Sequence, residues 1–556
     1  MSSRTEPTEV LSVSDLCVDA RTPEGRRRVL HNISFDLNLN ETLCIAGESG
    51  SGKSVTSLAI MGLLPKTSLQ VASGAIMLGD KNLLELSNSQ MRRVRGGDIA
   101  MIFQEPMTSL NPVMTIGDQM TEVIREHQVG TDEGALSVAR RMLEAVHMTE
   151  PARRLTQYPH ELSGGMRQRV MIAMALSCQP KVMIADEPTT ALDVTVQAQI
   201  LKLMREIKSE FGTSIILITH DMGVVAEMAD RVLVMQQGTL VEQGSATHIF
   251  NRPQQPYTQQ LLGSVLRLGS RRGEIGPPRI SAIPAPSPSK IATPVLEVSN
   301  LSVTYRRNES WWTKKSPASR TVSDIAFSIL PGETLGLVGE SGSGKSTTGK
   351  AVLSLVPFEG SVRIDGREVS GLTHREMQPV RRSAQMIFQD PYASLDPRMA
   401  IGLAIAEPLI IHGLANAGER QDRVADLLRR VGMPAESATR YPHEFSGGQR
   451  QRLCIARALA LNPKLIVADE SVAALDVSVR AKVLDLMLEL QETLGLAYLF
   501  ISHDMAVIER MSHHVAVMKA GRIVEMGTRR DVFENPQEDY TQSLLDAVLH
   551  PSVHRS

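Results

Sequence analysis

Short apolar runs recur along the chain, and several of them end in acidic residues or in histidine. The runs VMIADE and LIVADE end in two carboxylates, while IILITH and YLFISH end in histidine. Such short runs are typical of buried strands in a mostly parallel sheet. The segments LSVSDLCVDA and LEVSNLSVTY alternate apolar and polar residues, as half-exposed strands do. Helical stretches such as VADLLRRVGM lie between the strands, so the pattern predicts an α/β fold.

The same order of segments occurs twice. GESGSGKS stands at 47–54 and again at 339–346, and YPHELSGG at 158–165 returns as YPHEFSGG at 441–448. The second half of each copy keeps one offset of 283 residues (163 to 446, 257 to 540), whereas the glycine-rich segments are 292 residues apart (53 to 345). A repeat of this length with constant spacing indicates a duplicated domain.

The length agrees with two domains, because single cores rarely grow beyond about 250 to 300 residues. Between the copies lies RRGEIGPPRISAIPAPSPSKIATP, which is rich in proline and serine, as extended linkers are. We therefore predict a first domain at 1–264, a linker at 265–294 and a second domain at 295–556.

Composition excludes some classes of function. Lys and Arg number 59 against 61 Asp and Glu, so the net charge gives no case for a nucleic-acid partner. No apolar run approaches the roughly 18 residues that span a bilayer, and the start lacks the apolar core of a signal peptide, which predicts a cytosolic chain. The four cysteines show no C-x-x-C spacing, so neither a zinc site nor a disulfide framework is expected.

The pattern G-x-x-x-x-G-K-S predicts a phosphate-binding loop (P-loop), because its glycines let backbone N–H groups turn around phosphates at a helix N-terminus. Lys53 and Lys345 would contact the β- and γ-phosphates of ATP, and Ser54 and Ser346 would bind Mg²⁺ together with Asp186 and Asp469. A chance glycine-rich turn is excluded by two copies that each precede an Asp-Glu pair. The predicted nucleotide-binding residues are Gly47, Glu48, Ser49, Gly50, Ser51, Gly52, Lys53, Ser54 and Val55, then Gly339, Glu340, Ser341, Gly342, Ser343, Gly344, Lys345, Ser346 and Thr347.

Glu187 and Glu470 directly follow those aspartates, which places a carboxylate where a water must be oriented for attack on the γ-phosphate. Each is a candidate general base. An isolated glutamate after an apolar run is more often a solvated strand end, but its repetition beside a P-loop favours catalysis. His220 and His503 end the neighbouring runs and are predicted to contact the γ-phosphate, although a lone histidine there is usually structural.

Together these segments resemble the ATP-binding cassette (ABC) ATPases. The family signature LSGGQ is similar to LSGGM at 162–166 and FSGGQ at 445–449. The resemblance implies two tandem P-loop NTPase domains, each with a RecA-like α/β core, an antiparallel β subdomain and a helical signature subdomain. It also implies Q-loop glutamines at Gln104 and Gln389, which contribute to catalysis and to Mg²⁺ binding, and D-loop aspartates at Asp193 and Asp476.

Family geometry implies that each ATP lies on one copy's P-loop and is covered by the signature of the other. The covering residues would be Ser163, Gly164 and Gly165 for the second P-loop, and Ser446, Gly447 and Gly448 for the first. Neither of the two ATP sites lacks its glutamate, its histidine or its signature glycines, so both sites are predicted to hydrolyse ATP. Tyr305 falls where the family places an adenine-stacking aromatic, whereas Ala20 holds that position in the first copy, so the two sites are predicted to be unequal.

Three classes of ABC protein compete. A ribosome-acting translation factor would also carry two fused cassettes, but with a long charged helical linker, and a DNA-repair ATPase would carry coiled coils or paired cysteines. The tails NRPQQPYTQQLL and ENPQEDYTQSLL instead resemble those of peptide and nickel importer ATPases. That resemblance implies two membrane permease subunits, an extracytoplasmic substrate-binding protein and a peripheral place on the cytoplasmic face of the inner membrane.

Within that class the substrate stays open among glutathione, dipeptides, longer peptides, opine-like conjugates and nickel chelates. ATP and Mg²⁺ are the expected cofactors. No iron–sulfur cluster is expected, because no cysteine follows Cys454. The pair Trp311-Trp312 is interpreted as part of an enlarged hairpin loop rather than a membrane anchor.

Overall fold

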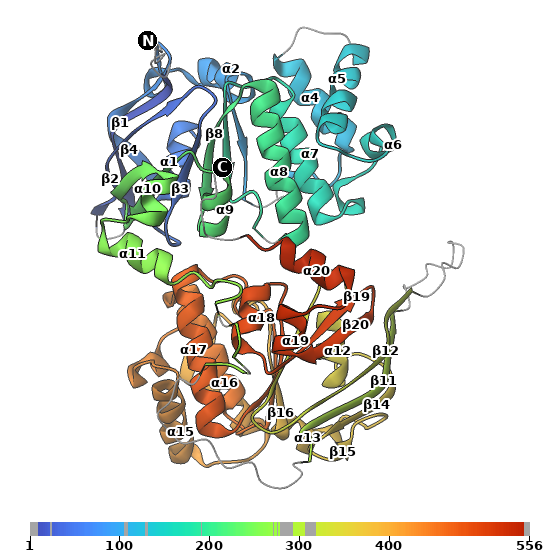
Figure 1. Cartoon of the computed structure of the whole chain (residues 1–556). Helices are drawn as coiled ribbons and strands as arrows, with labels where there is room; N and C mark the ends of the chain where they lie inside the picture. Colours follow the sequence, from blue (N-terminus) through green and yellow to red (C-terminus); the bar gives the residue numbers. More distant parts are fainter. Residues whose placement is uncertain are drawn as a thin grey trace. The chain divides into compact units, whose positions relative to one another are not determined.

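The computed structural model describes residues 9–22, 25–104, 109–127, 132–190, 192–270, 272–274, 276–278, 293–305 and 319–549. The chain divides into two compact units: the first comprises 1–192, 196–265 and 549–556, and the second 193–195 and 266–548. Figure 1 shows sheets flanked by helices in each of them. The pair Trp311-Trp312 lies outside the described residues.

The first unit contains two sheets. The antiparallel sheet has the order β2-β1-β4-β5, with β1 at Glu9–Thr22, β2 at Gly25–Asn38, β4 at Leu69–Leu78 and β5 at Lys81–Asn82. The other has the order β10-β9-β3-β8-β7-β6, with β3 at Thr42–Ala46, β6 at Ile99–Ile102, β7 at Val182–Asp186, β8 at Ser214–Thr219, β9 at Arg231–Gln236 and β10 at Thr239–Ser245. Its pairs are parallel except for β9 with β10.

The second unit repeats this arrangement. Its antiparallel sheet has the order β12-β11-β14-β15, with β11 at Leu296–Tyr305, β12 at Ser319–Ile329, β14 at Glu359–Ile364 and β15 at Arg367–Glu368. The mixed sheet has the order β16-β17-β18-β13-β19-β20, with β13 at Thr334–Val338, β16 at Ala384–Ile387, β17 at Leu465–Asp469, β18 at Ala497–Ile501, β19 at His514–Lys519 and β20 at Arg522–Thr528.

Helices follow in the same order in both units. The first has α1 at Lys53–Ile60, α2 at Asn88–Gly97, α4 at Ile116–His127, α5 at Asp132–Ala145, α6 at Pro151–Leu155, α7 at Gly164–Leu176, α8 at Val194–Phe211, α9 at Met222–Met228, α10 at Ala246–Asn251 and α11 at Pro256–Gly263. The second has α12 at Lys345–Val352, α13 at Met377–Ser383, α14 at Ile401–Ile411, α15 at Ala417–Arg430, α16 at Gly447–Leu459, α17 at Val477–Leu494, α18 at Met505–Met511, α19 at Arg529–Glu534 and α20 at Asp539–Asp546. Helices α4 to α7, and α14 to α16, form the helical subdomains.

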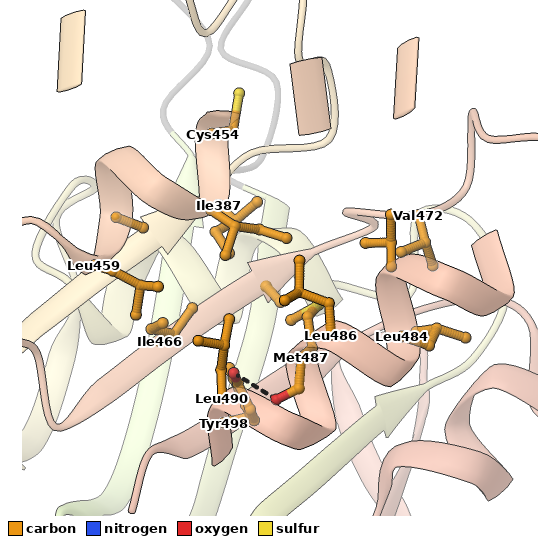
Figure 2. Close-up of a cluster of buried hydrophobic side chains, with 14 of the residues drawn as sticks. Ile387, Cys454, Leu459, Ile466, Val472, Leu484, Leu486, Met487, Leu490 and Tyr498 are labelled. Carbon is orange, nitrogen blue, oxygen red and sulfur yellow. Dashed lines mark hydrogen bonds between the residues drawn. The ribbon is translucent and has the colours of Figure 1, made fainter. Parts of the chain in front are cut away.

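The apolar runs of the sequence are the central strands, as predicted. All five residues of β7 and of β17 are buried, because helices cover both faces of the mixed sheet. Figure 2 shows how α17 packs onto this sheet in the second unit. There Tyr498 is fully buried, and its hydroxyl donates to the carbonyl of Met487 over 3.0 Å, so its polar atom is satisfied within the core.

The first residues after α11 belong to the second unit, although the sequence predicts them as linker. Leu266 and Leu268 pack against its core. The backbone N–H of Gly269 donates to Glu509 over 2.9 Å, and that of Gly273 donates to Glu534 over 2.9 Å. Both carboxylates flank Arg529, which is fully buried. The described residues 266–270 and 272–274 therefore pack as part of the second unit.

Two further features concern the described part of the chain. No helix there has the length and apolar character needed to span a membrane. Cys17, Cys44 and Cys454 are buried and Cys178 is partly buried, and no disulfide joins them.

Candidate functional site

The two P-loops have the backbone that phosphate binding requires. Each lies between the first strand of the mixed sheet and the helix that follows it, β3 and α1 or β13 and α12. Gly47 has φ 150°, and a Cβ there would lie 2.3 Å from the carbonyl oxygen of Met235. Gly339 has φ 149°, with the corresponding contact to Met518 at 2.1 Å. Only glycine fits these positions.

The P-loop lysines are buried at the start of their helices. Lys53 Nζ donates to the carbonyls of Gly47 and Glu48 over 2.7 and 2.8 Å, and Lys345 makes the same contacts at the same distances with Gly339 and Glu340. Burial lowers the pKa of the Lys345 ammonium, although nearby carboxylates oppose the shift. Each ammonium therefore lies against the loop, where a phosphate can replace its carbonyl partners.

Two of the three predicted metal ligands, the serine and the aspartate, contact each other in each unit. Ser54 donates to Asp186 over 3.2 Å, and Ser346 donates to Asp469 over 2.7 Å. Burial raises the pKa of Asp186 to about 6 and also raises the pKa of Asp469. A buried carboxylate beside a hydroxyl is a set of hard oxygen donors, so the residues fit a divalent cation such as Mg²⁺.

The candidate bases are held by the predicted glutamine and histidine. In the first unit Gln104 donates to one oxygen of Glu187 over 2.8 Å, and His220 Nδ1 lies 2.9 Å from the other. Burial opposes ionisation, but the hydrogen bond and charge of His220 outweigh it, so the pKa of Glu187 lies below its ordinary value. The carboxylate is therefore ionised at neutral pH, as a base must be.

The second unit has the same arrangement. Gln389 donates to Glu470 over 2.7 Å, and His503 Nδ1 lies 3.2 Å from its other oxygen. Burial alone would lower the pKa of His503, but the bond and charge of Glu470 raise it, while Glu470 itself has a lowered pKa. Glu187 and Glu470 also have φ of 48° and 46°, a conformation that non-glycine residues seldom adopt and that concentrates at functional sites.

One difference between the bases was not predicted from the sequence. The hydroxyl of Thr190 donates to Glu187 over 2.9 Å, whereas Ala473 stands at that position in the second unit. The sequence does carry a signal for it, since TTALDV in the first copy reads VAALDV in the second. Glu187 thus has one more hydrogen-bond donor than Glu470 among these groups.

The signature residues lie at the starts of α7 and α16. Ser163 caps α7 by accepting from the N–H of Met166 over 3.3 Å, and Ser446 caps α16 through Gln449 over 3.4 Å. A Cβ on Gly165 would lie 2.6 Å from Val196 of α8, which explains that glycine by packing alone. Gly164, Gly447 and Gly448 occupy the same first turns. Asp193 and Asp476 lie just before α8 and α17.

Strand register confirms the alignment of Ala20 with Tyr305. Leu11 of β1 pairs with β2 and β4 as Leu296 of β11 pairs with β12 and β14, and Ala20 and Tyr305 each follow nine residues later. The Tyr305 side chain is 45% exposed at the end of its strand, so its ring is available to a ligand. The first unit has no ring at this position.

Comparison with known proteins places this arrangement in a family. A family model described as ABC transporter matches residues 30–190 and 322–473, which hold both P-loops and both signatures. The chain belongs to the ABC transporter family. It is an ATPase of the ABC type, with ATP as its nucleotide, and the resemblance found in the sequence is confirmed. A second model, described as oligopeptide/dipeptide transporter, C-terminal region, matches residues 241–290 and 524–556.

Similar proteins span the whole of this ABC protein. It is 54% identical over its full length to the glutathione import ATP-binding protein GsiA of Salmonella paratyphi A, of which it covers 92%. It is 53% identical, with the same coverage, to the protein of that name from Escherichia coli strain K12. A solved dimeric cassette bound to ADP and Pi is 25% identical with a TM-score of 0.39, covering 42% of this chain and 98% of its own. The two import ATP-binding proteins give no support to a ribosome-acting function.

Proposed function

We propose that this chain hydrolyses ATP to drive import of a peptide-class substrate, with glutathione as the first candidate. The observation that carries the proposal is the full-length identity of 54% to a glutathione import ATP-binding protein. The tail model for oligopeptide and dipeptide transporters matches both copies and supports the same class. Substrate would pass through partner permeases, delivered by an extracytoplasmic binding protein, while this chain stays peripheral at the cytoplasmic face of the membrane.

Within each site the contacts support the following roles. Lys53 and Lys345 would exchange their loop carbonyls for phosphate oxygens, and Glu187 and Glu470 would orient and deprotonate the attacking water. In each site the glutamine, Gln104 or Gln389, and the histidine, His220 or His503, contact different oxygens of that carboxylate. The histidine would also reach the γ-phosphate. Mg²⁺ would be held by Ser54, Asp186 and Gln104, or by Ser346, Asp469 and Gln389, and would supply charge neutralisation on the phosphates.

Each ATP would also be covered by the signature of the other copy. Helix α7 or α16 would direct its N-terminus and backbone N–H groups at the γ-phosphate, and the D-loop aspartates Asp193 and Asp476 would lie at this junction. The pair Ser49→Cys and Gly447→Cys, in a chain without its native cysteines, tests the arrangement. ATP should be required for a disulfide between them, and a disulfide that forms equally without ATP would count against closure by nucleotide.

A surface beside the second Q-loop supports a membrane partner. A hollow of about 350 Å³ is lined by Phe388, next to Gln389, and by the exposed end of α14. Ile411 lines this hollow and is 64% exposed, and its neighbour Ile410 is 45% exposed. Exposed apolar clusters of this kind mark protein contacts. We infer that a permease segment with an apolar face binds this hollow.

The corresponding helix of the first unit carries different chemistry. Ile411 of α14 corresponds to Glu126 of α4, which lines a charged hollow together with Asp118 and Arg125. The two cassettes would therefore select different partner segments, one apolar and one charged. An Ile411→Glu variant should lose only the permease on the second cassette, and Leu494→Glu, at an apolar position 41% exposed on α17, is the matched control.

Co-purification tests the function as a whole. The tagged chain would be expressed in its native host, bound proteins identified by mass spectrometry, and ATP hydrolysis measured with and without them. Recovery of permeases that stimulate hydrolysis is expected, and their binding protein can then be screened with glutathione and dipeptides. Recovery of ribosomes or DNA without membrane subunits would overturn the importer proposal and leave a two-site ATPase.

A further inference from the structure

The tail of each cassette is fixed to the edge of its mixed sheet by one glutamate. Glu242 of β10 accepts from the backbone N–H groups of Gln254 and Gln255 over 2.8 and 3.1 Å, just before α11 begins. In the second cassette Glu525 of β20 accepts from Gln537 and Glu538 over 2.8 and 3.3 Å, just before α20. The start of each tail helix is therefore held against the sheet that carries the P-loop.

A tyrosine in the first turn of each tail helix reaches the P-loop. The hydroxyl oxygen of Tyr257 accepts from the backbone N–H of Glu48 over 3.2 Å. Tyr540 accepts from the backbone N–H of Glu340 over the same 3.2 Å. Two copies that have diverged elsewhere, at Ala20 and Tyr305 for example, keep this contact unchanged. Packing of the tail alone does not require a hydroxyl at this position.

The peptide that the tyrosine contacts also contacts the P-loop lysine. The N–H of Glu48 and the C=O of Gly47 belong to one planar trans peptide unit, so they point in opposite directions. Tyr257 binds the N–H end, and Lys53 donates to the C=O end over 2.7 Å. Gly339, Glu340, Tyr540 and Lys345 repeat this geometry. The hydroxyl therefore fixes the orientation of the peptide plane that holds the lysine ammonium.

We propose that Tyr257 and Tyr540 are positioning residues for ATP binding, acting through the first peptide of the P-loop. The tyrosine holds the glycine-led turn in its phosphate-ready shape before ATP arrives, so less ordering remains to be done on binding. The inference rests on the proposed ATP sites, and it gives the tail region a role in nucleotide binding. Because the tyrosine acts through the backbone of the loop, it affects ATP affinity more than the chemical step.

Removing only the oxygen tests this role. In Tyr257→Phe, Tyr540→Phe and the double variant the ring still packs, so thermal stability should stay close to wild type. Loss of one neutral hydrogen bond should raise KM for ATP about three- to tenfold while kcat changes less than twofold. Hydrogen exchange of the P-loop amides at 44–54 and 336–346 should accelerate, while exchange in the tail helices stays unchanged.

The matched control is Gln259→Ala, which removes a hydrogen bond of α11 to the carbonyl of Pro253 without reaching the P-loop. It should leave KM unchanged. Phenylalanine variants with wild-type KM and wild-type P-loop exchange would overturn the inference, as would a loss of stability with unaltered kinetics. If the wild-type chain itself shows no ATP hydrolysis, the proposed function fails instead, so the two failures are distinguishable.

Discussion

The backbone N–H of Thr334 donates to Nδ1 of His513 over 3.0 Å, at the point where β13 enters the core of the second unit. In the first unit the N–H of Thr42 donates to Asp230 over 2.8 Å at the corresponding place. The same backbone N–H thus donates to a histidine ring in one cassette and to a carboxylate in the other.

This difference predicts pH-dependent stability in the second unit. Burial lowers the pKa of His513, with Glu333 opposing and His514 assisting the shift. Only a ring whose Nδ1 is unprotonated can accept the Thr334 N–H. The unfolded chain binds a proton near the ordinary value of about 6.5, so stability is highest above that pH and falls as the pH decreases below it. Calorimetry should show the transition of the second unit moving to lower temperature between about pH 7.5 and pH 5.5.

His513→Asn keeps a neutral acceptor that does not titrate. The variant should lose most of the pH dependence of that transition. A slope equal to that of the wild type would assign the effect to another group.

Replacing the candidate bases should stop hydrolysis at one site at a time. Glu187→Gln and Glu470→Gln keep the size and hydrogen-bonding capacity of the side chain but remove its basicity, which costs about 10²- to 10⁴-fold in the chemical step. Each variant should lose ADP trapping at a single site and still bind ATP. Trapping with vanadate and labelled ATP measures this, and a variant that traps as much as wild type would refute two active sites.

The missing ring at Ala20 predicts unequal nucleotide affinity. Stacking of a base on an aromatic ring is worth about 1 to 3 kcal/mol, so Tyr305→Ala should weaken the second site by at least about fivefold. Ala20→Tyr should strengthen nucleotide binding at the first site. Titration with a fluorescent ATP analogue resolves the two affinities. If the affinity of the second site is unchanged in Tyr305→Ala, the Tyr305 ring does not stack on adenine.

Much of the fold follows from the sequence because the mixed sheet is buried on both faces. VMIADE and LIVADE predict β7 and β17, because continuous apolar runs of this length are typical of a strand that is covered on both faces. The grouping of the candidate site residues within a unit was equally predictable. Each P-loop serine, glutamate, glutamine and histidine follows a strand of the mixed sheet and each aspartate ends one, and those strand ends meet at one edge.

Contacts without a recurring local pattern could not be predicted in this way. The Tyr257 hydroxyl meets Glu48 across 209 residues, and only the packing of α11 against the sheet edge brings them together. The burial of Arg529 is a stronger case, because an arginine at the start of a helix normally points to solvent. The facing of signatures and P-loops across the two cassettes stays a prediction.

The buried cluster around Arg529 predicts a specific pattern of stability. Glu509 lies 3.5 Å from its guanidinium and is 3% exposed, and Glu274 in the stretch after α11 accepts from it through a backbone carbonyl. The first unit has Ala246 and Ala226 at the positions of Arg529 and Glu509, so the fold tolerates a neutral version. Removing one charge alone leaves the other buried without compensation, which costs about 3 to 5 kcal/mol.

Arg529→Ala should therefore destabilise the second unit by about that amount in urea unfolding, and the double variant with Glu509→Ala should recover at least half of the loss. Trypsin should cut after Arg272 faster in the single variant, since the stretch after α11 loses its anchor. Equal stability of the single and double variants would show that the ion pair is not the source of the effect, and unchanged cleavage would separate the cluster from the anchoring of the chain.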